Sequence, residues 1–410
     1  MDKVLGLIAE YNPFHNGHFY HLQKSKELTG ANYTIAVITG NFTQRGSTSI
    51  IDKWSKARMA LLNGVDLVIE LPVLYSISSA ENFAEGSIKI LNSLGIVDYV
   101  SFGAETSDIS ILDKFAEVLY NEPKDYKTLL SHELSKGLSF PKARENALML
   151  YIRDIRKSVN VLSSPNNILG IEYLKALRKY KSNIQPISIS RVESEYNSTN
   201  FDTNIASATA IRNLVKNKSF DIIENLVPSY TYSILMDNVK NGHVVTDLSV
   251  FEKEIIYVLR KMSIEEISNL PDVSEGLEFA IKNAANSCNS IVEFLNIVKS
   301  KRYTSTRLQR ILLYALLGIT KKDMAISKKI TPYIRVLGFN ENGKNLISEI
   351  HRLNPKLEII TSVKKFVDTN TNKNSKKLLD KDIFATNVYT IGFEYDSLNN
   401  LDYTNGIIKV

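Results

Sequence analysis

The first 215 or so residues alternate short apolar runs with amphipathic segments, and this alternation constrains the fold most strongly. Five runs have the composition of buried strands: residues 4–9, 33–38, 67–70, 99–102 and 185–189. Four segments between them carry apolar residues at helical spacing: 18–28, 53–62, 80–94 and 109–119. This succession predicts an α/β fold, a parallel sheet with helices on both faces. Ligands bind such sheets at the carboxyl ends of the strands.

The pattern changes near residue 216. Helical spacing dominates segments 251–261, 274–285, 290–298 and 306–317, in which Gly and Pro are rare. The polar stretch 368–377 predicts an exposed loop, and the β-branched and aromatic content of 383–393 predicts a strand near the end of the chain. We therefore expect two domains: an α/β domain, 1–215, and a mainly helical domain, 216–410, with a terminal strand.

Composition excludes several classes of protein. Cys288 is the single cysteine, which rules out an internal disulfide and a cysteine metal cluster. No run approaches about 18 consecutive apolar residues, and the first apolar run is too short for a signal peptide. We expect a cytoplasmic protein without a membrane segment. The net charge of +6 permits a nucleic-acid partner without requiring one, and nothing indicates an obligate protein partner.

Residues 13–18 read Pro-Phe-His-Asn-Gly-His and join the first predicted strand to the first predicted helix. A helix N-terminus presents N–H groups and partial positive charge, which suit phosphate. Gly17 lets backbone approach a ligand closely, and the imidazoles of His15 and His18 can donate hydrogen bonds to phosphoryl oxygens. Such donors stabilise the charge that builds up in phosphoryl transfer, with no covalent nucleophile required.

Two simpler interpretations of the histidines compete with phosphate binding. They can cap the helix and face solvent, or they can ligate zinc. Histidine pairs that bind metal on a helix usually stand four apart, and no cysteine lies nearby, so we expect no metal held by protein ligands. His21 is expected on the helix surface or in packing.

The string resembles the HxGH signature of the nucleotidyltransferase superfamily, which implies a Rossmann-like core and attack on the α-phosphate of ATP with release of pyrophosphate. The superfamily often has a second element late in the core, a Ser/Thr-rich turn before a helix with an arginine. Residues 207–212, Ser-Ala-Thr-Ala-Ile-Arg, fit it. Ser207 and Thr209 can cap the helix and bind phosphate, and Arg212 can neutralise the β- and γ-phosphates.

Longer strings resemble one family, the bacterial tRNA(Met) cytidine acetate ligases, over nearly the whole chain. They are residues 9–18, 40–46, 52–54, 66–72, 101–105 and 164–170. The resemblance implies two half-reactions. Acetate attacks the α-phosphate of ATP to give acetyl-adenylate, and the wobble cytidine amine of elongator tRNA(Met) then takes the acetyl group to form N4-acetylcytidine. One departure from the wider superfamily is Asn12, where an acidic residue often precedes the proline; the amide matches the narrower family.

The resemblance also implies which residues bind ATP. The strand–turn–helix contributes Leu7, Ile8, Ala9, Glu10, Tyr11, Asn12, Pro13, Phe14, His15, Asn16, Gly17, His18, Phe19 and Tyr20. Gly103, one of Asn166 and Asn167, and Arg191 complete the set, although unaided they also read as a turn glycine, a helix cap and a surface cation. Arg45 and Lys53 are candidates for acetate or phosphate contacts, with solvated cations as the alternative. Asp52 is a candidate to orient Lys53 or bind Mg²⁺, which accompanies ATP.

Residues 299–310 contain five cations, one aromatic ring, several hydroxyls and no acid. Such a mixture suits contacts with RNA phosphates and occasional stacking, although it also fits a solvated helix start. The predicted tRNA contacts are Lys299, Lys301, Arg302, Arg307 and Arg310. Two other functions share parts of this pattern. A small-molecule nucleotidyltransferase has the same ATP site but no need for a long helical second half, and a non-catalytic RNA-binding protein has no need of both histidines and Arg212.

Overall fold

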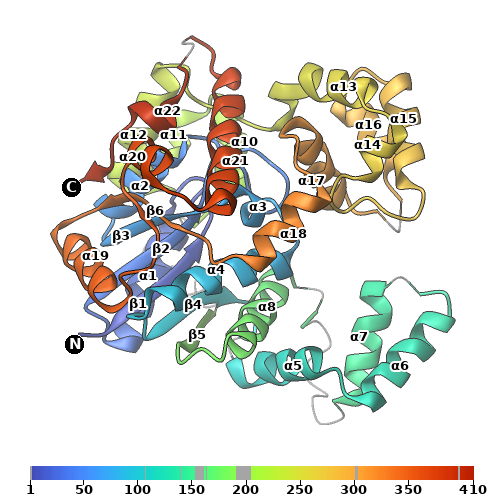
Figure 1. The fold of residues 1–410 in the computed structure, drawn as a ribbon, viewed down its shortest axis with the longest axis horizontal. Coiled ribbons are helices and arrows are strands. Elements are labelled where there is room, and N and C mark those ends of the chain that lie inside the picture. Colours follow the sequence, from blue (N-terminus) through green and yellow to red (C-terminus); the bar gives the residue numbers. More distant parts are fainter. Residues whose placement is uncertain are drawn as a thin grey trace.

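The computed structural model describes residues 2–106, 108–138, 140–152, 161–162, 164–190, 205–300, 303–395 and 398–410. An eight-stranded sheet organises this part of the chain, with the strands in the order β5-β4-β1-β2-β3-β6-β7 and β8 paired with β6. Figure 1 shows helices on both sides of it. The strands are β1 (Val4–Ala9), β2 (Tyr33–Thr39), β3 (Leu67–Leu71), β4 (Tyr99–Ala104), β5 (Gln185–Ser190), β6 (Ile334–Phe339), β7 (Ile359–Ile360) and β8 (Ile408–Lys409).

The predicted parallel α/β core is confirmed. The strands β5, β4, β1, β2 and β3 pair in parallel, and all five coincide with apolar runs of the sequence. Strand order reverses beside β1, because β2 and β3 follow on one side while β4 and β5 lie on the other. Ligands of doubly wound sheets bind at such a reversal, outside the carboxyl ends of the strands. The turn after β1 therefore occupies the expected binding position.

The helices of the first half follow local signals. The Asp52 carboxylate accepts the N–H groups of Trp54 and Ser55 and so begins α2, while Gly30 ends α1 with φ of 63°. The four predicted helices appear as α1 (Asn16–Thr29), α2 (Lys53–Leu62), α4 (Ala80–Leu94) and α5 (Ile109–Asn121). The other helices among the described residues of this half are α3 (Val73–Ser76), α6 (Lys124–Ser135), α7 (Phe140–Tyr151), α8 (Pro165–Lys179) and α10 (Ala208–Lys216).

The second half is mainly helical, as expected, and it also supplies β6, β7 and β8 to the sheet of the first half. β6 pairs antiparallel with β3, so residues far apart in sequence share one hydrogen-bonded framework. The helices are α11 (Phe220–Ile223), α12 (Ser229–Lys240), α13 (Glu252–Lys261), α14 (Ile264–Ser268), α15 (Leu277–Ser287), α16 (Ile291–Val298), α17 (Ser305–Leu316), α18 (Lys321–Lys329), α19 (Glu341–Leu353), α20 (Val363–Thr369), α21 (Lys373–Tyr389) and α22 (Leu401–Thr404).

The predicted strand over 383–393 is wrong, because most of that segment belongs to α21 and a short 3-10 turn (Thr390–Gly392) follows it. Asp382, Thr386 and Tyr389 are all buried, and their spacing of four and three places them on one face of a helix. That face lies against the core, so the packing of a helix outweighs the intrinsic preference of the β-branched residues for strands. The predicted loop 368–377 shrinks to the residues between α20 and α21.

Two helical groups extend from the sheet on the right of Figure 1, α13–α16 above and α6–α7 below. The upper group is joined to the α/β part by a shared apolar core, which contains Phe42 and Leu74 together with Ile255 of α13 and Ile281 of α15. None of the described helices is long and apolar enough to span a membrane.

Candidate active site

The turn after β1 brings the two histidines together. His15 is the N-cap of α1, and its ring stacks on that of His18 with centroids 3.7 Å apart. The backbone N–H of His15 donates to Nδ1 of His18 at 3.2 Å. Because Nδ1 is the acceptor, the proton of a neutral His18 ring sits on Nε2. The geometry therefore orients His18 as a donor through Nε2, the state that a phosphoryl oxygen requires.

Aromatic side chains hold this orientation. Tyr11 meets the His18 ring edge-on at 5.0 Å, and Phe14 lies 5.7 Å from it. Leu7, Tyr11 and Phe14 are buried in the core beneath the turn, whereas Phe19 is 38% exposed on the first turn of α1. The buried members of the predicted ATP-binding string thus position the turn, in which His15 is buried and His18 is partly exposed.

Gly17 makes room for the His15 ring. A Cβ at this position would lie 3.0 Å from Cε1 and 3.1 Å from Nδ1 of His15, closer than ordinary van der Waals contact. The sequence predicts that Gly17 lets a ligand approach the backbone closely. The structure adds a second reason for glycine here, which is the close contact with the His15 ring.

If the chain has the activity that the resemblance implies, we expect Gly17→Ala to lower its rate of pyrophosphate release by about tenfold, because displacement of the His15 ring disturbs the stack with His18. Alanine is a better helix former than glycine, so the midpoint temperature of thermal unfolding should not fall. Initial rates with ATP and acetate provide the measurement, and Gln23→Ala, an exposed change on the same helix, is the control. A wild-type rate for Gly17→Ala would contradict the role of Gly17 in placing the His15 ring.

The late Ser/Thr/Arg string reaches the same turn. Arg212 donates through Nη1 to the carbonyl of Asn12 at 2.9 Å, across 200 residues of sequence, and through Nη2 to Thr209 at 3.0 Å. Ser207 is the N-cap of α10 and accepts the N–H of Ala210. The structure therefore brings the two motifs of the sequence together at one place.

The Asn12 side chain explains why an amide precedes the proline. Its Nδ2 donates to the carbonyl of Thr48 at 3.1 Å, and its Oδ1 accepts the N–H of Ile50 at 2.7 Å. A carboxylate could not donate the first of these bonds. Asn12 thus ties the histidine turn to the segment after β2. An acidic residue at this position would lose the hydrogen bond to the Thr48 carbonyl as well as adding a negative charge.

Loop 40–46, which follows β2, lies over the same end of the sheet. The N–H of Gln44 donates to Oε1 of Glu10 at 2.9 Å. Arg45 is exposed. Burial, opposed by the charge of Glu10 and aided by that of Arg45, lowers the pKa of Arg212, so the two guanidinium groups lie within electrostatic reach of each other. Two neighbouring cations beside a helix N-terminus form an environment suited to an anion.

The remaining ATP candidates lie across the strand reversal. Gly103 belongs to β4 near its carboxyl end, two residues beyond Ser101, which pairs with Leu7 of β1. Asn167 is buried and bonds with Thr106 through both ends of its amide, whereas the partly exposed Asn166 donates to Glu105 at 2.6 Å. Asn166 is thus the better placed of the two asparagines for a ligand. Arg191 lies outside the described residues.

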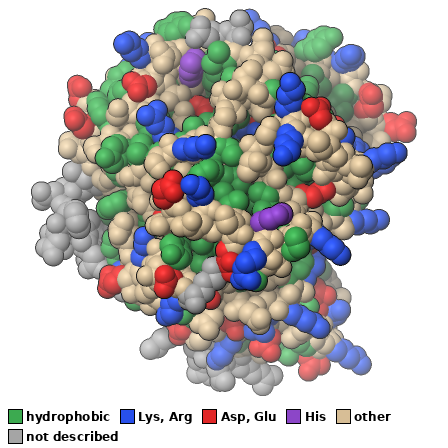
Figure 2. Space-filling model, turned by 60° about the vertical axis from the view of Figure 1, so that its left-hand side comes forward, with side chains coloured by type: hydrophobic (Ala, Val, Ile, Leu, Met, Phe, Trp, Pro, Cys, Tyr) green, Lys and Arg blue, Asp and Glu red, His purple; other side chains and the backbone are tan. Residues whose placement is uncertain are grey.

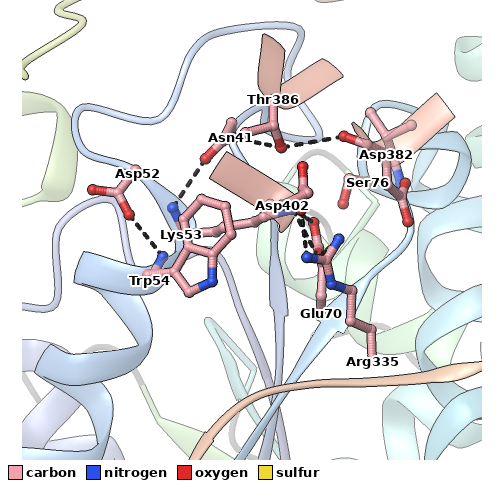
Figure 3. Close-up of polar contacts among 12 residues, drawn as sticks. Asn41, Asp52, Lys53, Trp54, Glu70, Ser76, Arg335, Asp382, Thr386 and Asp402 are labelled. Atoms are coloured by element: carbon pink, nitrogen blue, oxygen red, sulfur yellow. Dashed lines mark hydrogen bonds and ion pairs between the residues drawn. The ribbon is translucent and has the colours of Figure 1, made fainter. Parts of the chain in front are cut away.

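Lys53 requires a correction, because its ammonium faces carboxylates in the interior instead of an anion at the surface. Its Nζ lies 2.9 Å from Oε1 of Glu70 and 2.7 Å from Oδ1 of Asp402, and the side chain is fully buried. Arg335 pairs with the same two carboxylates, which completes a four-charge cluster of Lys53, Glu70, Arg335 and Asp402 (Figure 3). Asp52 caps α2 and does not orient the Lys53 ammonium.

The predicted tRNA segment is also corrected in part. Arg310 is buried and pairs with Asp272 at 2.8 Å, and Arg307 donates to the carbonyl of Asp272 at 2.6 Å. Both therefore hold the turn before α15, whereas Lys299 is exposed and Lys301 and Arg302 lie outside the described residues. On the face in Figure 2, Lys and Arg side chains are spread among acidic ones instead of forming one continuous field.

Residues 2–403 match the family model described as HIGH Nucleotidyl Transferase. The tRNA(Met) cytidine acetate ligase of Thermoanaerobacter sp. (strain X514) is 45% identical over 409 residues, which cover 99% of this chain and 100% of the relative. The chain belongs to this family of ligases.

Other members agree over the same length. The tRNA(Met) cytidine acetate ligase of Acetivibrio thermocellus is 42% identical over 414 residues, 99% of each chain. The crystal structure of Thermotoga maritima TmcAL bound with alpha-thio ATP superimposes with a TM-score of 0.92 at 36% identity, covering 100% of this chain and 99% of that one. The ligase fold is therefore shared from the first strand to the last.

Sequence reasoning missed several residues that shape this ligase site. Asn225 and Leu226 accept hydrogen bonds from the side chain and backbone of Asn16, which places the segment before α12 against the histidine turn. Glu70 carried a usable signal, since a carboxylate within an otherwise apolar strand requires a buried partner. Lys56 carried a similar one, on the apolar face of α2 three residues after Lys53.

Proposed function

We propose that this chain is an ATP-dependent tRNA(Met) cytidine acetate ligase, which activates acetate as acetyl-adenylate and acetylates the wobble cytidine of elongator tRNA(Met) to N4-acetylcytidine. One observation carries the proposal: Arg212 bonds to the turn that holds His15 and His18, so both phosphate-binding motifs meet at the strand reversal. The names and the near full-length identity of the relatives support the choice of acetate and tRNA as substrates.

In the first half-reaction an acetate oxygen attacks the α-phosphorus of ATP, and the bond to the bridging oxygen of the β-phosphate breaks. Negative charge builds up on the α-phosphoryl oxygens and on the leaving pyrophosphate. The Nε2–H of His18 donates to the phosphoryl group, while Arg212 and Arg45 neutralise the pyrophosphate or the incoming carboxylate. Mg²⁺ bound to ATP supplies further neutralisation of the leaving group.

In the second half-reaction the exocyclic nitrogen of the cytidine attacks the acetyl carbon, AMP leaves with the bonding electrons, and the nitrogen loses a proton. The amine is a weak nucleophile, so its placement against the acyl carbon contributes most of the rate. Glu10, Asn166 and Gly103 lie around the end of the sheet where the adenylate forms, and we assign the last two to the nucleotide together with Arg191.

We assign tRNA binding to the mainly helical part, residues 216–410, and ATP binding and catalysis to residues 1–215. The exposed Lys299, with Lys301 and Arg302, supplies phosphate contacts, whereas Arg307 and Arg310 stabilise the surface through Asp272. A tRNA substrate also places the enzyme in the cytoplasm.

Replacing Lys299, Lys301 and Arg302 together by alanine should weaken tRNA binding by about tenfold or more at about 0.1 M salt and flatten the dependence of affinity on salt. Exposed Lys364, Lys365 and Lys373, changed together to alanine, are the control of equal charge. Affinities measured over a salt series provide the test. The assignment is wrong if the first triple keeps the wild-type slope, or if both triples lose affinity equally.

Acetate-dependent exchange of labelled pyrophosphate into ATP tests the first half-reaction without tRNA. The proposal expects exchange that requires acetate and Mg²⁺ and that is absent with propionamide, which lacks the carboxylate. Pyrophosphate release with a phosphorylated metabolite in place of acetate would instead assign the chain to small-molecule nucleotidyl transfer.

A further inference from the structure

Lys56 is a fully buried lysine of α2 whose ammonium reaches the carboxyl ends of two catalytic strands. It donates to the carbonyl of Glu10, directly after β1, at 3.0 Å. It also donates to the carbonyls of Thr39 and Gly40, at the end of β2, each at 2.7 Å, and lies 3.2 Å from the Thr39 hydroxyl. One side chain thus joins the start of the histidine turn to the start of loop 40–46.

These contacts fix the two segments that face the reacting groups. Glu10 is bound from both sides, since its carbonyl accepts from Lys56 and its carboxylate accepts from the N–H of Gln44. Gln44 and Arg45 lie in the loop that begins at Gly40, and the histidines lie in the turn that begins at Glu10. The Lys56 contacts therefore fix where both segments start. A shift at the Lys56 ammonium would change the distance between Arg45 and the histidine turn.

We propose that Lys56 is a positioning residue for acetate adenylation, whose charged ammonium holds the histidine turn and loop 40–46 at the separation that the reaction needs. This inference rests on the proposed function. Because the Lys56 side chain is fully buried and its ammonium is bonded to backbone carbonyls, we assign it a positioning role and not a catalytic one. It acts by presenting three N–H donors to three backbone carbonyls, which a neutral amine, with two donors and a lone pair, cannot do.

The Lys56 side chain changes between its charged and neutral forms near neutral pH. Burial lowers the pKa of Lys56 to about 7, opposed by the charges of Glu10, Glu70 and Asp52 and aided by that of Lys53. Above pH 7 the free enzyme loses the third donor, so kcat/KM for ATP should fall on the alkaline side. The polyanionic ATP favours the ammonium, so the same limb in kcat should lie at higher pH.

The contribution of Lys56 to folding stability depends on pH in the opposite direction from its effect on kcat/KM. The two effects can therefore be told apart. A lysine whose pKa is lowered by folding holds fewer protons when folded than when unfolded, so its contribution to stability rises between about pH 7 and its unfolded pKa. A fall in activity above pH 7 with no loss of stability therefore does not come from unfolding.

The test uses the full chain and acetate-dependent pyrophosphate release, with Lys56→Met, which keeps an unbranched side chain one atom shorter than lysine and removes its charge. The expected result is a fall in kcat of about 100-fold, a small change in KM for ATP, and loss of the alkaline limb. Lys56→Gln retains two donors and should recover part of the rate. Lys53→Met is the matched control: it is equally buried on the same helix, pairs with interior carboxylates, and should lower stability while the folded enzyme keeps its kcat.

The outcomes separate the inference from the function on which it rests. Absence of acetate-dependent pyrophosphate release in the wild-type protein would refute the proposed function. Release by wild type together with a wild-type kcat and alkaline limb in Lys56→Met would overturn the role of Lys56. If neither Lys56 variant folds, the wild-type profile decides, because a kcat/KM that stays level from pH 6 to pH 9, while the protein remains folded, overturns it equally.

Discussion

Replacing His18 by alanine is expected to lower acetate-dependent pyrophosphate release by a factor of about 10² to 10³, with little effect on folding. The backbone N–H of His15 donates to Nδ1 of His18, which leaves Nε2–H as the donor for the α-phosphoryl group. A donor held in place before the reaction stabilises charge that appears only in the transition state, so its loss should reduce kcat more than it raises KM.

His21→Ala is the matched control for this prediction. His21 lies one turn further along α1, and its Nε2 is 3.0 Å from the hydroxyl of Ser101 on β4, so its ring is held against the sheet by a hydrogen bond within the protein. Steady-state rates should change by no more than a few-fold. The role of His18 fails if His18→Ala releases pyrophosphate at the wild-type rate, or if the two variants lose activity equally.

The second large effect is on stability and concerns the four-charge cluster (Figure 3). Arg335→Met leaves Glu70 and Asp402 buried with Lys53 as their shared cation, and removing one partner of a buried ion pair typically costs about 3–5 kcal/mol. The midpoint of urea unfolding should fall accordingly. The cluster joins α2, β3, β6 and α22, so its loss should loosen the C-terminal strands from the core.

Two variants show whether the loss comes from uncompensated charge. Arg335→Met combined with Asp402→Asn removes one charge of each sign and should recover part of the stability, because one interior carboxylate no longer lacks its cation. Arg352→Met breaks a surface pair with Glu349 and should leave the unfolding midpoint unchanged. An unfolding midpoint of Arg335→Met equal to that of wild type would show that the cluster does not stabilise the fold.

The five parallel strands and four of the helices of the first half were predictable because their signals are local. Apolar runs gave all five parallel strands, and Asp52 lies at the start of α2 as a helix cap should. The two motifs of the candidate site could be found in the sequence because each consists of residues close together in the chain: the pair His15 and His18, and the turn of Ser207 to Arg212. Their meeting at Asn12 followed from the expectation that parallel strands expose ligands at one edge.

The failures share a different physical origin, since they depend on partners distant in sequence. Lys53 looked like a surface cation because Asp402 lies 349 positions later and Glu70 is hidden in an apolar strand. Arg310 looked basic and exposed because its pairing with Asp272 exists only in the fold. The segment 383–393 has strand-like composition, yet the burial of one helical face selects α21. Local composition can indicate that a charged residue needs a buried partner, as at Glu70, but it does not identify that partner.

The most direct test of the central claim is to incubate the purified protein with ATP, Mg²⁺, isotopically labelled acetate and unmodified elongator tRNA(Met), digest the RNA, and analyse its nucleosides by mass spectrometry. Reactions without ATP, and with a tRNA(Met) carrying uridine at the wobble position, are the controls. The account predicts N4-acetylcytidine that carries the label and that appears only when ATP and the wobble cytidine are both present. Pyrophosphate release without any labelled nucleoside would contradict it and identify a different acceptor.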